Sequence, residues 1–201
     1  MQIERRTATV HALKVEQRAN TRPLLRGHAA VFGQLSEDLG GFREVIEAGA
    51  FREAVRLDDV RALFNHDANL VLGRNRAKTL RLSEDSQGLA IEIDLPDTSC
   101  ASDLYKLIQR GDVSQMSFGF TLRPNGDAWS KDASGQYIRT LRNLRLFDVS
   151  PVTFPAYPQT DVSVALRSLH AFQQRHGGGS THWRLTLMRR RLDLECDARR
   201  A

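Results

Sequence analysis

Apolar and polar residues alternate through much of the chain, with the period of a β-strand that buries one face. Within residues 114–122, the apolar side chains of Met116, Phe118 and Phe120 fall on one face of the strand. Within residues 89–95, leucine and isoleucine alternate with alanine and acidic residues. Both patterns predict strands of a sheet that turns one face to a core and the other to water.

The same reasoning predicts many further strands and a few helices. Strands are expected at residues 2–16, 24–32, 42–46, 60–65, 70–73, 79–83, 136–141, 143–149 and 162–166. Helices are expected at residues 48–56, 98–110 and 168–175, the second capped by Thr98 or Ser99 and ended by Gly111. Three prolines within residues 150–158 argue against a long central strand there. We therefore predict an α+β protein, mainly antiparallel β, built as a barrel or sandwich flanked by a few helices.

Composition adds limits to this prediction. A chain of 201 residues with 41% hydrophobic residues is long enough for one well-buried core and a short appendage. No apolar run approaches the roughly 18 residues of a membrane span, and no signal peptide is evident at the N-terminus. Cys100 and Cys196 match no metal-ligand spacing, and we expect free thiols in a reducing compartment.

The net charge of +5 is concentrated near the C-terminus. Residues 182–201 hold six arginines and three acids, a balance of +3, which leaves +2 for residues 1–181. The body is therefore not expected to bind nucleic acid specifically. We predict a folded domain at residues 1–166 and a helical, basic tail at residues 167–201, in which the glycine-rich stretch 177–180 is a flexible linker.

One serine is a candidate nucleophile. Ser117 lies on the polar face of its strand, and Gly119 two residues on is expected to leave open space beside the hydroxyl. The alternative is an ordinary polar residue that faces water. Ser114 competes with Ser117 but falls on the face of Met116 and Phe118, where we expect it to be buried or to cap the strand.

A base and an orienting acid are also available. His66 is expected at the end of a strand between polar neighbours, where a histidine exchanges protons or serves a structural role. Asp148 is expected to share a face with two leucines of the strand 143–149, and a half-buried carboxylate needs a partner. That partner is either a histidine or an arginine such as Arg142 or Arg145. The six histidines are scattered and no His-Glu-x-x-His motif occurs, so no metal or cofactor is expected.

Seven short blocks, in chain order across roughly residues 25–166, resemble the prohead maturation protease family of tailed double-stranded DNA phages. They are Gly27–Phe32 (GHAAVF), Arg43–Phe51 (REVIEAGAF), Ala62–Asp67 (ALFNHD), Val71–Arg74 (VLGR), Thr79–Leu82 (TLRL), Gly111–Phe120 (GDVSQMSFGF) and Val149–Tyr157 (VSPVTFPAY). Each block alone is short, and the ordered set carries the resemblance.

The resemblance implies a serine endopeptidase with a herpesvirus-assemblin-like β-barrel. Such an enzyme works inside the procapsid, assembled in the host cytoplasm, where it removes scaffolding segments of the major capsid protein and then cleaves itself. The portal is a further candidate partner, and neither a membrane nor a specific nucleic acid is expected. The different-class alternative is a non-catalytic capsid-assembly factor with a protease-like fold.

The family's histidine falls on His66, its serine on Ser117 and its acid on Asp148, where many relatives carry glutamate. Ser117 would attack the scissile carbonyl, His66 would transfer the proton, and Asp148 would orient the imidazole. Candidate oxyanion donors are backbone N–H groups near Ser117 or an arginine such as Arg139 or Arg142.

Overall fold

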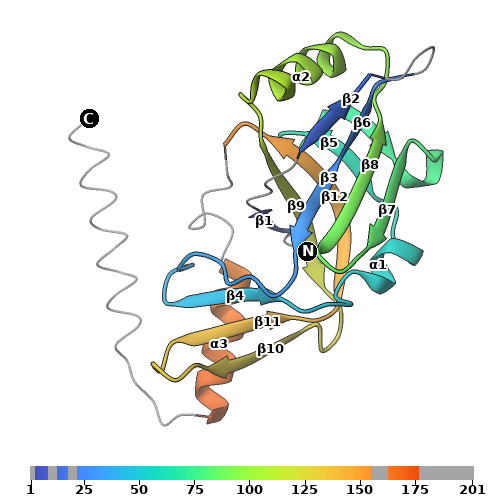
Figure 1. Cartoon of the computed structure of the whole chain (residues 1–201). Helices are drawn as coiled ribbons and strands as arrows, with labels where there is room; N and C mark the ends of the chain where they lie inside the picture. Colours follow the sequence, from blue (N-terminus) through green and yellow to red (C-terminus); the bar gives the residue numbers. More distant parts are fainter. Residues whose placement is uncertain (1–2, 9–12, 18–21, 155–162, 177–201) are drawn as a thin grey trace. The chain divides into compact units, whose positions relative to one another are not determined.

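The computed structural model describes residues 3–8, 13–17, 22–154 and 163–176 (Figure 1). The chain divides into two compact units, Met1–Val164 and Ala165–Ala201. The expected linker at 177–180, the basic end of the tail and Cys196 lie outside the described residues. No helix within the described ranges is both long and apolar enough to cross a membrane.

The described strands pair into three sheets, and each sheet has a simple strand order. The first holds β1 (Glu4–Ala8), β9 (Gln115–Leu122), β12 (Leu144–Val152), β5 (Arg61–Phe64) and β6 (Asp67–Arg74), in that order. The second holds β2 (Lys14–Glu16), β3 (Leu24–Val31), β8 (Gly88–Asp94) and β7 (Leu80–Glu84). The third holds β10 (Asp127–Lys131), β11 (Tyr137–Leu141) and β4 (Phe42–Ile46).

The helices of the described residues are α1 (Arg52–Leu57), α2 (Ser99–Arg110), α3 (Ser163–His176) and a 3₁₀ turn η1 (Asn75–Ala77). Among the described strands, all pairs are antiparallel except β12 with β5 and β11 with β4. The α+β, mainly antiparallel class is therefore confirmed. Among the described strands no hydrogen-bonded order closes into a barrel.

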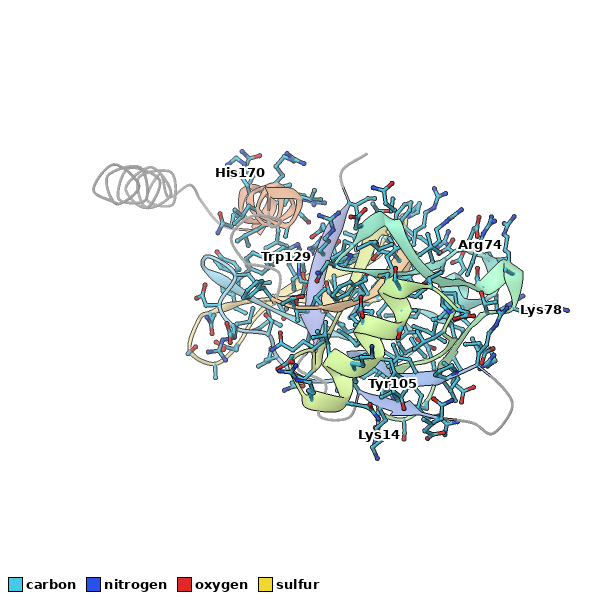
Figure 2. All side chains as sticks on the ribbon, turned by 90° about the horizontal axis from the view of Figure 1, so that it is seen from above. Lys14, Arg74, Lys78, Tyr105, Trp129 and His170 are labelled. Atoms are coloured by element: carbon cyan, nitrogen blue, oxygen red, sulfur yellow. The ribbon has the colours of Figure 1, made fainter. Side chains whose placement is uncertain are left out.

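The clearest local signals of the sequence are confirmed. The Thr98 side chain caps α2 by accepting a hydrogen bond from the Ala101 N–H, and Gly111 ends the helix in the left-handed conformation. The helix buries Ala101, Leu104 and Ile108 and lies beside β2 (Figures 1 and 2).

Two expectations about secondary structure are wrong. No strand was expected in the polar stretch around Trp129, which forms β10. Pairing with β11 stabilises this strand, and the residues of β10 alone do not predict it. Residues 163–166, expected as an edge strand, begin the helix α3. β12 runs three residues beyond its expected end at Val149 and includes Pro151. The β12–β5 ladder covers only Asp148 and Val149, so the missing N–H of the proline removes no bond from it.

A single apolar cluster fills the space between the sheets and α1 and α2. At its centre the Phe51 and Phe118 rings meet edge to face with centroids 5.4 Å apart. Phe118 also lies 5.2 Å from Phe120, so the apolar face predicted for β9 is the face that anchors this strand in the core.

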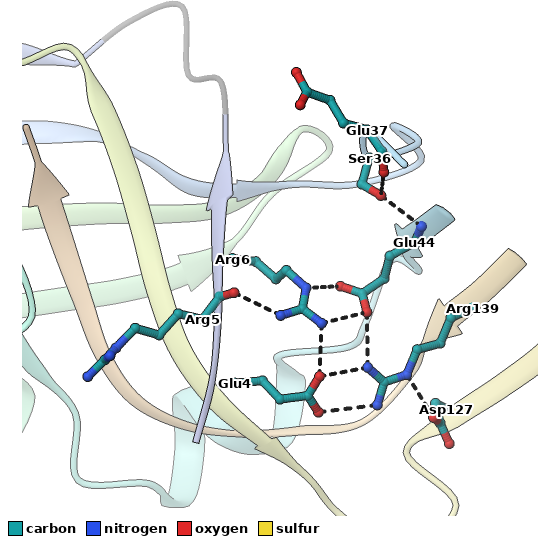
Figure 3. A network of polar contacts seen from close by, with 8 residues as sticks. All are labelled: Glu4, Arg5, Arg6, Ser36, Glu37, Glu44, Asp127 and Arg139. Carbon is teal, nitrogen blue, oxygen red and sulfur yellow. Dashed lines mark hydrogen bonds and ion pairs between the residues drawn. The ribbon is translucent and has the colours of Figure 1, made fainter. Parts of the chain in front are cut away.

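Buried ion pairs connect β1 to the three-stranded sheet (Figure 3). The Arg139 side chain is 0% exposed and donates to Glu4 at 2.8 Å, to Glu44 at 3.0 Å and to Asp127 at 2.8 Å. Arg6 donates to Glu44 at 2.7 Å and to Glu4 at 2.8 Å. Burial alone would lower the pKa of Arg139, but hydrogen bonding to Glu4 and the charges of Glu44 and Glu4 raise it above its ordinary value. The arginine therefore stays charged, and each buried carboxylate keeps a partner.

Replacing Arg139 with methionine should lower the free energy of unfolding by about 3–5 kcal/mol, because Glu4 and Glu44 would each lose a buried partner. Urea denaturation measures the loss. Arg81→Met is the matched control, because Arg81 pairs with Glu92 and Asp94 on the exposed face of β7 and should cost about 1 kcal/mol or less. Equal losses in the two variants would contradict the role given to the buried network.

Candidate active site

The nucleophile candidate Ser117 lies on β9, between β1 and β12 in the five-stranded sheet. Its antiparallel partner on β12 is Ser150, and Gly119 two residues on is opposite Asp148. Directly opposed residues of an antiparallel pair project from the same face of the sheet. The register of β9 and β12 therefore places Ser117, Ser150 and Asp148 on one face.

A β-bulge brings Asp148 to this face. The register between β12 and β9 shifts between Leu146 and Asp148, so that Phe147 is the extra residue. Leu146 stays opposite Phe120 in the core, whereas Asp148 lies opposite Gly119. The expectation that Asp148 shares the face of the leucines is therefore wrong, because strict alternation ends at the bulge.

His66 reaches the same face from the next hairpin of the sheet. It is the second residue of the two-residue turn between β5 and β6, and it does not end a longer strand as expected. Asn65 and His66 have φ of 54° and 58°, as a type I′ turn requires at both central positions. A non-glycine residue in this conformation costs about 1–2 kcal/mol, so the local structure must hold the turn.

The structure brings the three predicted site residues into hydrogen-bond contact. His66 Nδ1 lies 2.5 Å from Asp148 Oδ2, and His66 Nε2 lies 2.7 Å from Ser117 Oγ. An ionised carboxylate only accepts hydrogen bonds, so Nδ1 carries the proton and donates to Asp148. Nε2 then accepts from the Ser117 hydroxyl, which is the arrangement in which an imidazole serves as a general base toward serine.

Two further residues surround the acid, and sequence reasoning missed the role of both. The Ser150 hydroxyl, itself buried, donates to Asp148 Oδ2 at 2.7 Å. A Cβ on Gly119 would lie 2.4 Å from Asp148 Oδ1. The space beside Ser117 that was expected to be open is thus filled by the carboxylate. The signal available in the sequence was Gly119 itself, which was interpreted as open space beside the hydroxyl, whereas its missing side chain makes room for the Asp148 carboxylate.

The alternative site residues named from the sequence lie outside β9 or pair with other side chains. Ser114 directly precedes β9 and is exposed, so the expectation that it is buried on the Met116 face is wrong. Arg139 donates to the buried acids of the charge network, and Arg142 pairs with Glu47 at 2.9 Å. Asp148 has His66 as its partner, and both arginines proposed as oxyanion donors are paired with other acids in this arrangement.

The possible metal ligands and the burial of the site complete its description. Within the part of the chain that the structure describes, no group of three or more His, Cys, Asp or Glu residues is arranged to hold a metal ion. Ser117 is 0% exposed and Asp148 is 8% exposed, so the hydrogen-bonded chain is shielded from water. A substrate carbonyl can reach Ser117 Oγ only after a neighbouring group moves.

Gly119→Ala should displace the Asp148 carboxylate and slow reaction of Ser117 with a fluorophosphonate by about 10²-fold, the scale of a 1 Å misplacement. The rate is read from intact mass against time. In an Asp148→Ala background the same change should have almost no further effect, because its target is gone. An equal slowing in both backgrounds would show that Gly119 acts by another route.

Comparison with known proteins identifies the family of this chain. A family model described as caudovirus prohead serine protease matches residues 10–175. The prohead protease of Enterobacteria phage HK97 is 30% identical over 154 residues, which cover 75% of this chain and 63% of that protein. The chain thus spans somewhat less than two thirds of the length of this curated relative. The solved structure of the bacteriophage T4 capsid assembly protease matches with a TM-score of 0.42 and 10% identity, over 75% of this chain and 97% of that one. The match of the family model across most of the sequence places this chain in the caudovirus prohead serine protease family.

Proposed function

We propose that this protein is a serine endopeptidase that cleaves capsid scaffolding segments, and itself, during phage prohead maturation. The observation that carries the proposal is the continuous chain of hydrogen bonds from Ser117 through His66 to Asp148. Membership of the prohead protease family supports the assignment of a peptide as the substrate.

In the acylation step Ser117 Oγ attacks the scissile carbonyl carbon, and its proton passes to His66 Nε2. The new Oγ–C bond gives a tetrahedral oxyanion, which collapses as His66 returns the proton to the leaving amine and the C–N bond breaks. Asp148 accepts from Nδ1–H throughout and stabilises the imidazolium. Ser150 donates to the same carboxylate oxygen and limits its rotation.

Deacylation repeats these proton transfers with water. His66 takes a proton from the attacking water, the ester C–Oγ bond breaks, and the proton returns to Ser117. With Arg139 and Arg142 engaged elsewhere, backbone N–H groups near Ser117 are the candidates for the oxyanion site.

The same proposal covers the substrates, the place of action and the domain bounds. The substrates are the major capsid protein with its scaffolding segment and the enzyme itself, with the portal as a further candidate partner. The place of action is the procapsid interior, assembled in the host cytoplasm. Residues 1–166 form the protease domain, a variant of the assemblin-like barrel in which the sheets pack without closing one continuous ladder. Residues 167–201 form the basic tail.

A non-catalytic assembly factor with this fold is the alternative. Such a factor would have no need to keep a strained histidine turn or a buried carboxylate aimed at it. Retention of all three groups in hydrogen-bond contact favours an enzyme.

Ser117→Ala should lower proteolysis by about 10³-fold or more, as removal of a triad nucleophile does. The protein is co-expressed with the cognate capsid protein, and intact masses report scaffold removal. Ser114→Ala is the matched control, because this serine is exposed and lies outside β9. Loss of cleavage in Ser114→Ala with retention in Ser117→Ala would mean that the nucleophile is wrongly assigned.

Self-cleavage is expected between roughly Arg167 and Arg191, because a glycine-rich stretch is a sequence typical of accessible backbone. Intact mass of the purified wild-type protein should show this loss, whereas Ser117→Ala should keep its full mass. When the two proteins are mixed, cleavage of the Ser117→Ala chain shows that one molecule cleaves another, and its survival shows that cleavage occurs within a molecule. A full-length wild-type protein that nevertheless removes the scaffold would exclude this self-processing.

A further inference from the structure

The turn that carries His66 is held to β12 by the residue before it. Asn65 Oδ1 accepts a hydrogen bond from the Thr153 N–H at 2.8 Å, and Asn65 Nδ2 donates to Thr153 Oγ1 at 3.2 Å. The Asn65 N–H donates to the Pro151 carbonyl at 3.0 Å. We name the side-chain contacts between Asn65 and Thr153 the clasp.

The clasp lies where the sheet itself provides little support. The parallel ladder between β5 and β12 covers only Arg61 with Asp148 and Ala62 with Val149. Beyond it, the described hydrogen bonds between the turn and β12 are those of Asn65 and the bond from His66 to Asp148.

The clasp connects the turn of His66 to the strands that carry its two hydrogen-bond partners, Asp148 and Ser117. Asp148 and Thr153 both belong to β12 or its end, and β12 pairs with β9, which carries Ser117. A bond from the turn to Thr153 therefore fixes His66 relative to the strand that holds the acid and, through that strand, relative to the nucleophile.

We propose that Asn65 and Thr153 are positioning residues that hold the His66 imidazole between Asp148 and Ser117, an inference that rests on the proposed protease function. Both are exposed, so their hydrogen bonds compete with water and contribute little to folding stability. Their effect is on the geometry of proton transfer, where a displacement of 1 Å costs about 10²-fold in rate.

The experiment must separate the effect of losing the clasp from the effect of changing the turn conformation, since asparagine also favours positive φ. Asn65→Gly keeps access to the left-handed conformation and removes both side-chain hydrogen bonds. Thr153→Val removes only the Oγ1 acceptor, and Thr153→Ser restores it. Asn125→Gly is the matched control, because Asn125 has φ of 55° in a turn beyond the other end of β9.

The experiment combines kinetics with a measurement that needs no substrate. Asn65→Gly should lower kcat for scaffold cleavage by about 10²-fold with KM nearly unchanged, Thr153→Val should lower it less, and Thr153→Ser and Asn125→Gly should match the wild type. Urea denaturation midpoints should agree among all variants. In NMR spectra, the deshielded His66 Nδ1 proton, identified by its absence in His66→Gln, should weaken or broaden in Asn65→Gly.

Full kcat and an unchanged Nδ1 proton in Asn65→Gly would overturn the proposal, as would a loss of kcat that merely follows a loss of folded protein. If the wild type cleaves no peptide, the proposed function fails. The Nδ1 proton still decides whether the clasp positions the imidazole.

Discussion

The antiparallel register of β9 and β12 is the constraint on which the site depends. It sets Ser150 opposite Ser117 and Asp148 opposite Gly119, and the bulge at Phe147 sends the acid to the face of the serine. A slip of one residue would exchange the two faces, so that the nucleophile would enter the core and the phenylalanines would enter the site. The packing of Phe118 against Phe51 on the opposite face makes that exchange costly.

Polar groups buried at the site are tolerable because each has a partner. Ser117, His66, Asp148 and Ser150 form one connected set of hydrogen bonds, in which the Asp148 carboxylate contacts both His66 and Ser150. The buried ion network follows the same rule on the other face of β9, where Glu4 and Arg6 project toward Arg139. That network fastens β1, which pairs with the strand of the nucleophile.

Sequence patterns predicted those features that residue type determines locally. Alternation predicted β8 and the core face of β9, and Thr98 with Gly111 predicted the ends of α2. Motif resemblance selected Ser117, His66 and Asp148, and the structure brings them together. Their catalytic roles stay a proposal.

The features that were missed depend on pairing between distant segments. The bulge at Phe147 and the course of β12 through Pro151 follow from the strands on either side and not from the residues of β12 alone. The function of Gly119 requires knowing that Asp148 lies opposite it. The Arg139 network joins residues separated by as many as 135 positions, and the consecutive polar residues of β1 give no apolar stripe from which to predict it.

The most direct test of the central claim is to locate the covalent adduct formed by a fluorophosphonate on the folded protein, using digestion and mass spectrometry of the peptides. An activated nucleophile at the end of a hydrogen-bonded Ser-His-Asp chain predicts one adduct, on Ser117, whose formation is nearly abolished in His66→Gln. An adduct on another residue, no adduct on the folded wild type, or equal labelling of the His66→Gln protein would contradict the account.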